Sequence, residues 1–143
     1  MPKQPNILLI MSDQHSPHIL GCAGDEIVRT PTLDRLAQRG VRFTNTYCAN
    51  PLCVPSRMTF LTSRYSSDIR VWTNSCRLQS DITTFVHHLV NAGYETVLCG
   101  RMHFNGPDQR HGFERRIIGD VHPKLEHIPC STTGQTADGV KVA

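Results

Sequence analysis

Apolar residues occur in short runs that polar residues, proline and glycine separate, a pattern typical of alternating strands and helices. Residues 6–11 are a continuous apolar run that ends next to Asp13, which predicts a strand buried on both faces of a parallel sheet. Residues 30–40 start with Thr-Pro, space apolar residues three and four apart and end in glycine, which predicts a helix. Residues 41–47 alternate and are rich in β-favouring side chains, which predicts a second strand.

A second helical pattern opens at Pro55. The apolar side chains of Met58, Leu61 and Tyr65 are spaced so that they share one face of this helix. Because proline favours the first turn of a helix, we expect Cys53 to lie at or just before its N-terminus.

The same cycle then repeats once more. Residues 81–84 are predicted to cap a helix over residues 85–93, and a strand follows over residues 94–99. This rhythm predicts an α/β fold with a mostly parallel sheet flanked by helices. From residue 106 onward the pattern decays, and residues 131–143 are expected to be a loop or a frayed end. The 143 residues show no repeat and no linker, so they form one domain or part of one.

Composition narrows the function classes. The formal net charge of +3 is spread along the chain without a lysine or arginine run, which argues against a nucleic-acid partner. The first apolar run is too short to span a membrane and no signal-peptide cleavage pattern follows it, so we expect a cytoplasmic protein. No cysteine pair has zinc-finger or Cys-x-x-Cys spacing, and reduced thiols are expected at the cysteines other than Cys53. The six cysteines are Cys22, Cys48, Cys53, Cys76, Cys99 and Cys130.

The most specific motif is Cys-Val-Pro-Ser-Arg at residues 53–57. A chance match to Cys-x-Pro-Ser-Arg in a chain of this composition is expected at a frequency of about 0.002. This is the core at which sulfatases have a cysteine oxidised to Cα-formylglycine. A free buried cysteine ahead of a proline-started helix is the alternative interpretation.

Further blocks occur in the order found in the same family. The chain resembles the N-terminal portion of a type I, formylglycine-dependent sulfatase of the alkaline phosphatase superfamily. The resemblance implies a truncated sulfatase-like catalytic domain over residues 1–143, in which residues 1–123 match the family and residues 124–143 are an uncertain tail. The blocks that carry the resemblance are residues 6–14, 30–34, 36–43, 93–96 and 100–104.

Two stretches suggest a branch of this family. Residues 100–116 are most similar to choline sulfatases and their relatives. Asp13-Gln14 is typical of choline sulfatases and also of phosphonate monoester hydrolases, whereas many arylsulfatases have two adjacent aspartates there. The resemblance therefore favours a choline sulfatase-like lineage and leaves the substrate open.

The resemblance assigns catalytic roles to Cys53, Arg57 and His103. A hydrated aldehyde derived from Cys53 offers one hydroxyl that attacks sulfur and a second that expels sulfate. Arg57 lies one helical turn beyond Cys53 and is expected to hold the aldehyde hydrate; a solvated surface arginine is the alternative. His103 is expected to contact the formylglycine or the sulfate.

Substrate binding is assigned to Arg101 and Asn74. Arg101 stands where the family usually has lysine, so it keeps the charge and can hold sulfate through two N–H groups but cannot act as an acid. Asn74 lies at the family spacing after Cys53 and is expected to hydrogen-bond a substrate oxygen. In Thr-Asn-Ser it also fits an ordinary turn.

Metal binding is assigned to Asp13, Gln14 and the formylglycine at Cys53. Carboxylate and amide oxygens suit a hard divalent cation, which makes the attacking hydroxyl acidic and neutralises the sulfate charge. Calcium is favoured, with magnesium and manganese as alternatives. Asp13 could instead be a turn residue that ends a strand.

The sequence thus predicts a sulfuric ester hydrolase. Alternatives are a phosphonate or phosphate monoester hydrolase of the same superfamily, and a non-catalytic fragment or binding module. The expected partners are a small anionic sulfate ester and, during maturation, a formylglycine-generating enzyme. Because the family's second set of metal ligands cannot be placed in 143 residues, the isolated chain is expected to be inactive. An oligomer or a missing C-terminal portion is expected to complete it.

Overall fold

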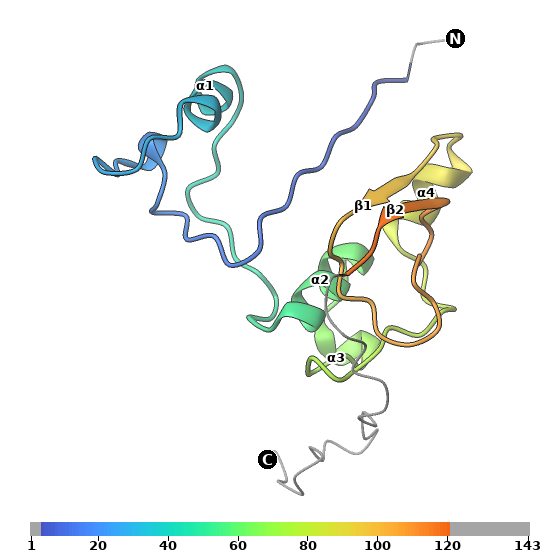
Figure 1. Ribbon diagram of the computed structural model, residues 1–143. Helices are drawn as coiled ribbons and strands as arrows, with labels where there is room; N and C mark the ends of the chain where they lie inside the picture. The colour runs from blue at the N-terminus through green and yellow to red at the C-terminus, as the bar shows by residue number, and fades with distance from the viewer. Residues whose placement is uncertain (1–3, 121–143) are drawn as a thin grey trace, which may run out of the picture. The chain divides into compact units, whose positions relative to one another are not determined.

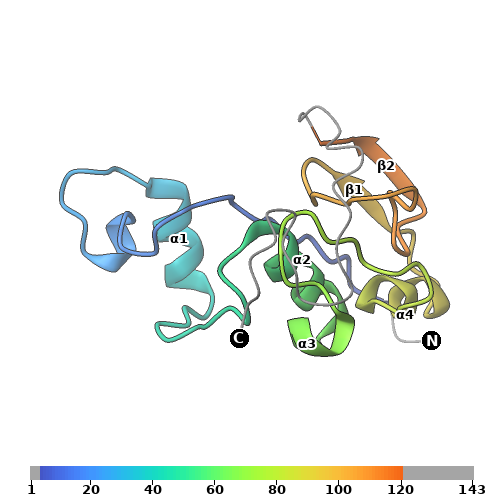
Figure 2. The same ribbon diagram turned by 90° about the horizontal axis from the view of Figure 1, so that it is seen from below.

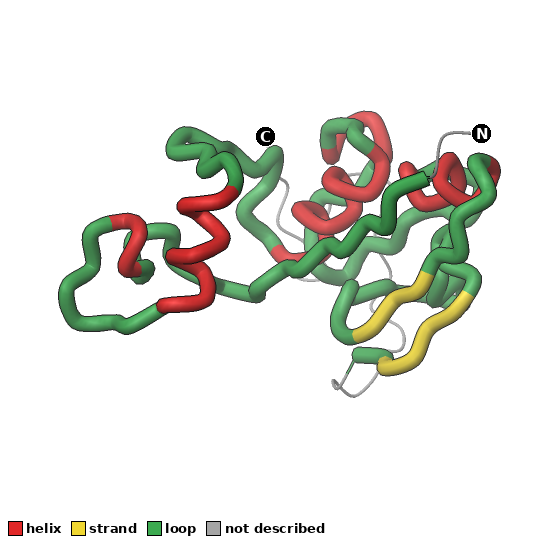
Figure 3. Tube along the Cα trace, turned by 90° about the horizontal axis from the view of Figure 1, so that it is seen from above, coloured by secondary structure: helices red, strands yellow, loops and turns green. Residues whose placement is uncertain are grey.

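The computed structural model describes residues 4–120. These residues form two compact units, the first ending at Thr46 and the second beginning at Tyr47, and each is described by itself (Figure 1). Outside two short helices the first unit consists of loops, whereas the second unit combines helices with two strands (Figure 3). No helix in the described part of the chain is long and apolar enough to cross a membrane.

The first unit contains the 3-10 helix η1 (Gly21–Ala23) and the helix α1 (Pro31–Arg39). The predicted helix over residues 30–40 is confirmed, with Pro31 in its first turn and Gly40 after its last residue. The carboxylate of Asp34 ties the two helices together, because its Oδ1 accepts hydrogen bonds from the Cys22 N–H at 2.7 Å and the Thr30 hydroxyl at 3.0 Å.

Two predicted strands, residues 6–11 and 41–47, are not strands in the structure. Their apolar side chains are exposed, with relative exposures of 84% at Leu8 and 79% at Phe43. The apolar pattern reflects a preference for burial, but a strand also needs a hydrogen-bonded neighbour. Within residues 4–120 the sheet contains neither segment, so the predicted strand–helix–strand crossover does not form there.

The second unit begins with α2 (Cys53–Thr62) and α3 (Ser66–Ile69). The predicted helix at residue 55 is confirmed, and Met58 and Leu61 are each 1% exposed. The placement of Tyr65 on the same face is wrong, since α2 ends before it at Ser63, which has a left-handed φ of 55°. Tyr65 instead precedes α3 and is 71% exposed.

The helix α4 (Phe85–Asn91) confirms the predicted helix over residues 85–93. Thr84 caps it, because its side-chain oxygen accepts the backbone N–H of His87 while Nδ1 of His87 accepts the Thr84 N–H at 3.1 Å. This reciprocal capping box satisfies N–H groups that the helix itself cannot pair. The helix therefore starts at the residue that the sequence indicates.

The sheet consists of two parallel strands, β1 (Val97–Cys99) and β2 (Arg115–Ile118), which lie side by side in Figures 1 and 2. β1 confirms the C-terminal half of the strand predicted over residues 94–99. β2 was not predicted, because two arginines open it and three of its four residues are exposed, so it lacks the alternating pattern of a half-buried strand.

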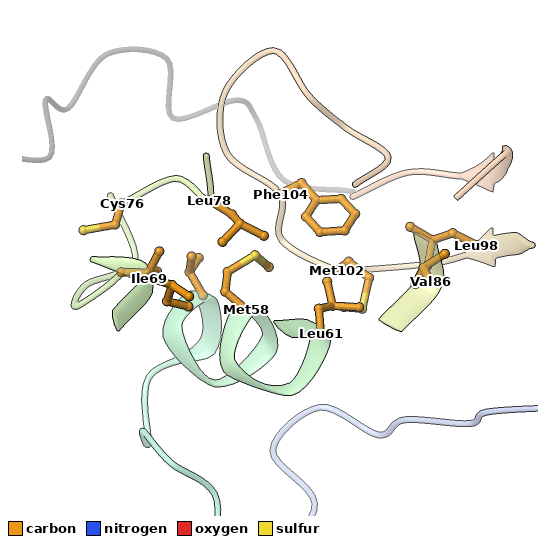
Figure 4. Packing of buried hydrophobic residues seen from close by; sticks show 11 residues of the cluster. Met58, Leu61, Ile69, Cys76, Leu78, Val86, Leu98, Met102 and Phe104 are labelled. Atoms are coloured by element: carbon orange, nitrogen blue, oxygen red, sulfur yellow. The ribbon is translucent and has the colours of Figure 1, made fainter. Parts of the chain in front are cut away.

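The core of the second unit packs α2 against the segment that follows β1 (Figure 4). Met58 and Leu61 of α2 point toward Met102 and Phe104, which come from that segment. Burying each such side chain stabilises the fold by about 1.5–3 kcal/mol. The core therefore fixes the segment after β1 relative to the helix that begins at Cys53. The buried hydrophobic residues are Val54, Met58, Leu61, Ile69, Val71, Cys76, Leu78, Val86, Leu98, Met102 and Phe104.

Among the cysteines within residues 4–120, Cys76 departs from the expected reduced state. Cys76 is disulfide-bonded, whereas Cys22, Cys48, Cys53 and Cys99 are free thiols. Cysteine spacing gave no hint of this bond, because pairing depends on which side chains the fold brings together. The expectations for Cys130 and for residues 124–143 lie outside the described residues.

Candidate active site

Cys53 is the first residue of α2 and is half-buried. The preceding residue, Leu52, has an extended backbone, and its carbonyl accepts the first helical hydrogen bond from the Ser56 N–H at 2.9 Å. The first N–H groups of a helix lack helical partners and carry partial positive charge. A nucleophile at this position is therefore presented where negative charge is stabilised.

Asn74 caps α2 directly beside Cys53. Its Oδ1 accepts a hydrogen bond from the Val54 N–H at 2.9 Å. Asn105 in turn donates through Nδ2 to the carbonyls of Asn74 at 2.6 Å and Cys76 at 2.8 Å. With Oδ1 engaged by the helix, Nδ2 is the group through which Asn74 would make the predicted contact with a substrate oxygen.

Arg57 is 7% exposed, so the alternative of a solvated surface arginine is wrong. Its Nη1 donates to the carbonyl oxygen of Arg101 at 2.9 Å. A buried guanidinium needs such partners, because an unpaired buried charge is costly. The bond joins the helix of the predicted nucleophile to the segment that carries the predicted sulfate-binding residues.

Arg101 and His103 lie together on the side of their segment away from the core. Met102 and Phe104, which alternate with them, are 7% and 5% exposed. Nη2 of Arg101 is 3.1 Å from Nδ1 of His103. Because arginine can only donate, Nδ1 accepts this hydrogen bond, and the proton of the neutral ring lies on Nε2.

The backbone at His103 is bonded to a residue that the sequence did not indicate. His103 has a left-handed φ of 58°. Its N–H donates to both carboxylate oxygens of Asp120, each at 3.1 Å. Asp120 is paired with Arg116 of β2 at 2.9 Å. Aspartate 17 residues after the histidine matches no local motif, so only the fold brings the two together.

A buried histidine packs behind this segment. The ring of His111 is 4.7 Å from that of Phe104, and its side chain is 1% exposed. Burial lowers the pKa of His111, partly opposed by the charge of Asp108 at 3.3 Å, while His87 lowers it further. For Asp108, burial raises the pKa, but backbone hydrogen bonds from His111 and Arg110 outweigh it, so its pKa lies below the usual value.

The predicted metal ligands Asp13 and Gln14 are both exposed and belong to the first unit. Within residues 4–120, no three His, Cys, Asp or Glu side chains group so as to hold a metal ion. The carboxylate of Asp13 and the amide oxygen of Gln14 are nevertheless the types of ligand that a hard divalent cation prefers.

Known proteins identify the family of this chain. The sulfatase family profile matches residues 5–133. The choline sulfatase of Rhizobium meliloti is 45% identical over 120 residues, which cover 84% of this chain and 23% of that protein. The chain belongs to the sulfatase family.

Solved structures agree with this assignment. BT4656 in complex with its substrate D-glucosamine-2-N,6-O-disulfate matches 80% of this chain and 23% of its own, with a TM-score of 0.74 and 36% identity. The phosphonate monoester hydrolase of Agrobacterium radiobacter matches 78% of this chain and 25% of its own, with a TM-score of 0.70 and 29% identity.

These matches confirm the predicted α/β, alkaline phosphatase-like fold and the recognition of an N-terminal portion. The chain spans about a quarter of the length of these proteins. The predicted boundary at residue 123 and the roles of the site residues stay predictions.

Proposed function

We propose that the protein carrying this chain hydrolyses sulfuric esters with a formylglycine nucleophile made from Cys53. The observation that carries the proposal is the placement of Cys53, within Cys-Val-Pro-Ser-Arg, at the start of α2 in a chain of the sulfatase family. Arg57, Arg101 and His103 follow in one continuous set of hydrogen bonds in the same unit. The N-terminus of α2 and the guanidinium groups of the arginines together favour binding of an anionic substrate.

The residues of this set divide the work between holding sulfate and moving protons. Arg101 presents a permanently charged guanidinium that can donate to two sulfate oxygens. His103 accepts from Arg101 through Nδ1, so its Nε2–H is the proton that it can donate to an oxygen of the substrate or of the hydrated aldehyde. Asn74 would donate through Nδ2 to a further substrate oxygen.

The proposed cofactor is a divalent cation, with calcium preferred over magnesium and manganese. Asp13, Gln14 and the oxygens of the modified Cys53 would hold it, since all three supply hard oxygen donors. The ion would lower the barrier to deprotonating the attacking hydroxyl and offset the charge of the sulfate. Calcium, magnesium and manganese are distinguished by metal analysis of the purified protein and by reconstitution after chelation.

The substrate is proposed to be a small anionic sulfate ester. The similarity to choline sulfatase makes choline sulfate the first compound to test, and the similarity to BT4656 makes a sulfated glucosamine the second. A formylglycine-generating enzyme is the proposed partner during maturation, because only the converted Cys53 can turn over.

A phosphonate monoester hydrolase is the second candidate function. Asp13-Gln14 fits that branch equally well, and the Agrobacterium radiobacter enzyme is a structural neighbour. The same nucleophile and cation suit either tetrahedral centre. The ratio of kcat/KM for an aryl sulfate to that for a phenyl phosphonate ester decides between the two. A non-catalytic fragment is the third candidate, and it predicts no turnover of either ester.

A cytoplasmic location is kept as a proposal. The disulfide at Cys76 counts against it, since such bonds persist mainly in oxidising compartments. Cell fractionation combined with thiol labelling of Cys76 tests the location. Recovery with an oxidised Cys76 in an extracytoplasmic fraction would overturn it.

Peptide mass spectrometry of the full-length protein, expressed with a formylglycine-generating enzyme, tests the proposed function. Cys53 is expected to be converted, and Cys53→Ala is expected to abolish the release of sulfate from choline sulfate or an aryl sulfate. Cys48→Ala is the matched control, because Cys48 is an exposed free thiol outside the motif. An active protein with only unmodified thiol at Cys53 would remove the proposed nucleophile.

A further inference from the structure

The left-handed backbone of His103 is bonded to Asp120, which forms an ion pair with Arg116. A φ of 58° lies in the left-handed region, which residues other than glycine adopt uncommonly, although asparagine, aspartate and histidine are enriched there. Such a conformation persists only where its surroundings impose it. The surroundings here are the two oxygens of Asp120, which both accept the His103 N–H at 3.1 Å.

Asp120 is itself fixed by Arg116. Their side chains are 16% and 13% exposed and lie 2.9 Å apart, so water screens the pair less than it screens a surface pair. The second arm of the Arg116 guanidinium, Nη1, donates to the backbone carbonyl of Gln109 at 3.2 Å and to its Oε1 at 2.7 Å. The guanidinium carbon also lies 5.7 Å from the ring centre of Phe104. Arg116 thus anchors Asp120 on β2 and on the loop before it.

We propose that Asp120, anchored by Arg116, is a positioning residue that fixes the imidazole of His103 beside Arg101. The proposal rests on the proposed function for its catalytic consequence. Among the contacts within residues 4–120, Arg57 bonds the segment of residues 101–103 at the Arg101 carbonyl and Asp120 bonds it at the His103 N–H. Without the second hold, the left-handed turn relaxes and Nδ1 of His103 leaves Nη2 of Arg101.

The first measurement needs no substrate. Hydrogen exchange at the His103 amide of the full-length protein is compared for the wild type, Asp120→Asn and Arg116→Lys. Asp120→Asn keeps the shape but removes the charge, and lysine cannot span Asp120 and Gln109 as a guanidinium does. Exchange at this amide is expected to become at least about tenfold faster in both variants, because its charged acceptor is lost or released.

The matched control is Glu95→Gln. It removes the ion pair between Glu95 and Arg115, which has the same 2.9 Å length and also reaches β2, but both of its side chains are 64% exposed. This variant is expected to leave the His103 amide and the rate of ester hydrolysis unchanged. Thermal unfolding of every variant verifies that the fold is kept.

The second measurement is a double-mutant cycle on kcat/KM with Asp120→Asn and His103→Gln. Asp120→Asn alone is expected to lower kcat/KM by about 10- to 100-fold, the scale of effect that a misplaced catalytic group produces. In the His103→Gln background it is expected to have little further effect, because a residue that acts only through His103 has nothing left to position.

Each outcome decides a different point. Unchanged exchange at the His103 amide in Asp120→Asn overturns the proposal, and so do additive losses in the double variant, which would show that Asp120 acts independently of His103. Absence of ester hydrolysis by the converted wild-type protein overturns the proposed function instead. In that case the amide exchange still shows whether Asp120 holds His103.

Discussion

At the scale of single residues, the motifs predicted candidate site residues but not the contacts that hold those residues in place. Cys53, Arg57 and His103 could be named because they match motifs of one family, and Arg101 because it stands where that family usually has lysine. Asp120 could not, since it lies 17 residues from His103 and meets it only in the folded chain. Burial of Arg57 was likewise invisible, because arginine is ordinarily exposed.

Two substitutions test the predicted roles of Arg101 in sulfate binding and of Asp13 in metal binding. Arg101→Lys is expected to retain most of the activity of the full-length protein, because lysine keeps the charge and is usual in the family. Asp13→Ala is expected to abolish metal-dependent turnover, because it removes an anionic ligand. Steady-state rates and metal content are measured for both. Normal metal occupancy and rate in Asp13→Ala would show that the metal site lies elsewhere.

His111 makes stability depend on pH. Its pKa in the folded chain is lowered below the usual 6.5 by burial, so the unfolded chain binds a proton more readily. Stability is therefore highest above pH 6.5 and falls as the pH drops below that value, until the folded form also protonates. Asp108 adds a separate loss at more acidic pH, since its pKa is lowered below 3.8.

Urea unfolding between pH 5 and pH 8 measures this dependence. His111→Gln is expected to flatten the change in unfolding free energy across this range. His88→Gln is the control, because His88 is exposed on α4. Equal slopes for wild type and His111→Gln would contradict the prediction.

At the scale of elements, helices were predicted better than strands. α1, α2 and α4 each begin where a proline or a capping threonine indicates, because helix hydrogen bonds and caps are local in sequence. Strand bonds are not local. The missed β2 pairs with β1 although 15 residues separate the end of one strand from the start of the other.

Thr84 offers a test of one such local signal. Its hydroxyl oxygen caps α4 by accepting the backbone N–H of His87, and its hydroxyl proton is donated to the carbonyl of His111 at 2.8 Å. Thr84→Ala is expected to destabilise the protein by about 1–2 kcal/mol, the cost of losing a helix cap together with a buried hydrogen bond. The exposed neighbour Thr83 gives the control, and Thr83→Ala should change the free energy of unfolding little. Equal effects of the two substitutions would argue against the cap.

At the scale of the whole molecule, the exposed apolar segments and the small number of predicted metal ligands determine how the isolated chain is expected to behave. Residues 6–11 and 41–47 expose apolar side chains that favour association. The 143-residue chain by itself is expected to associate and to hydrolyse no sulfate ester at a useful rate, even with Cys53 converted. A hard cation needs six or more oxygen ligands, and this chain offers only Asp13, Gln14 and the modified residue 53. Water would occupy most of the remaining coordination positions, so binding would be weak.

Size-exclusion chromatography and an ester assay of the purified chain, verified for formylglycine, test this expectation. Choline sulfate and an aryl sulfate are offered with calcium, magnesium or manganese. Multiple turnovers by a monodisperse 16.0 kDa species would contradict it and would mean that the chain holds a complete site.

The sequence by itself determined the family, the candidate nucleophile and the helix starts, because each depends on residues that are close together along the chain. The tertiary structure decided the rest: the burial of Arg57, the disulfide state of Cys76, the pairing of β2 and the hold of Asp120 on His103. The pairing of β2 and the bond from His103 to Asp120 join residues that are distant in sequence. No local pattern encodes such contacts, since only packing of the core brings the partners within hydrogen-bonding distance.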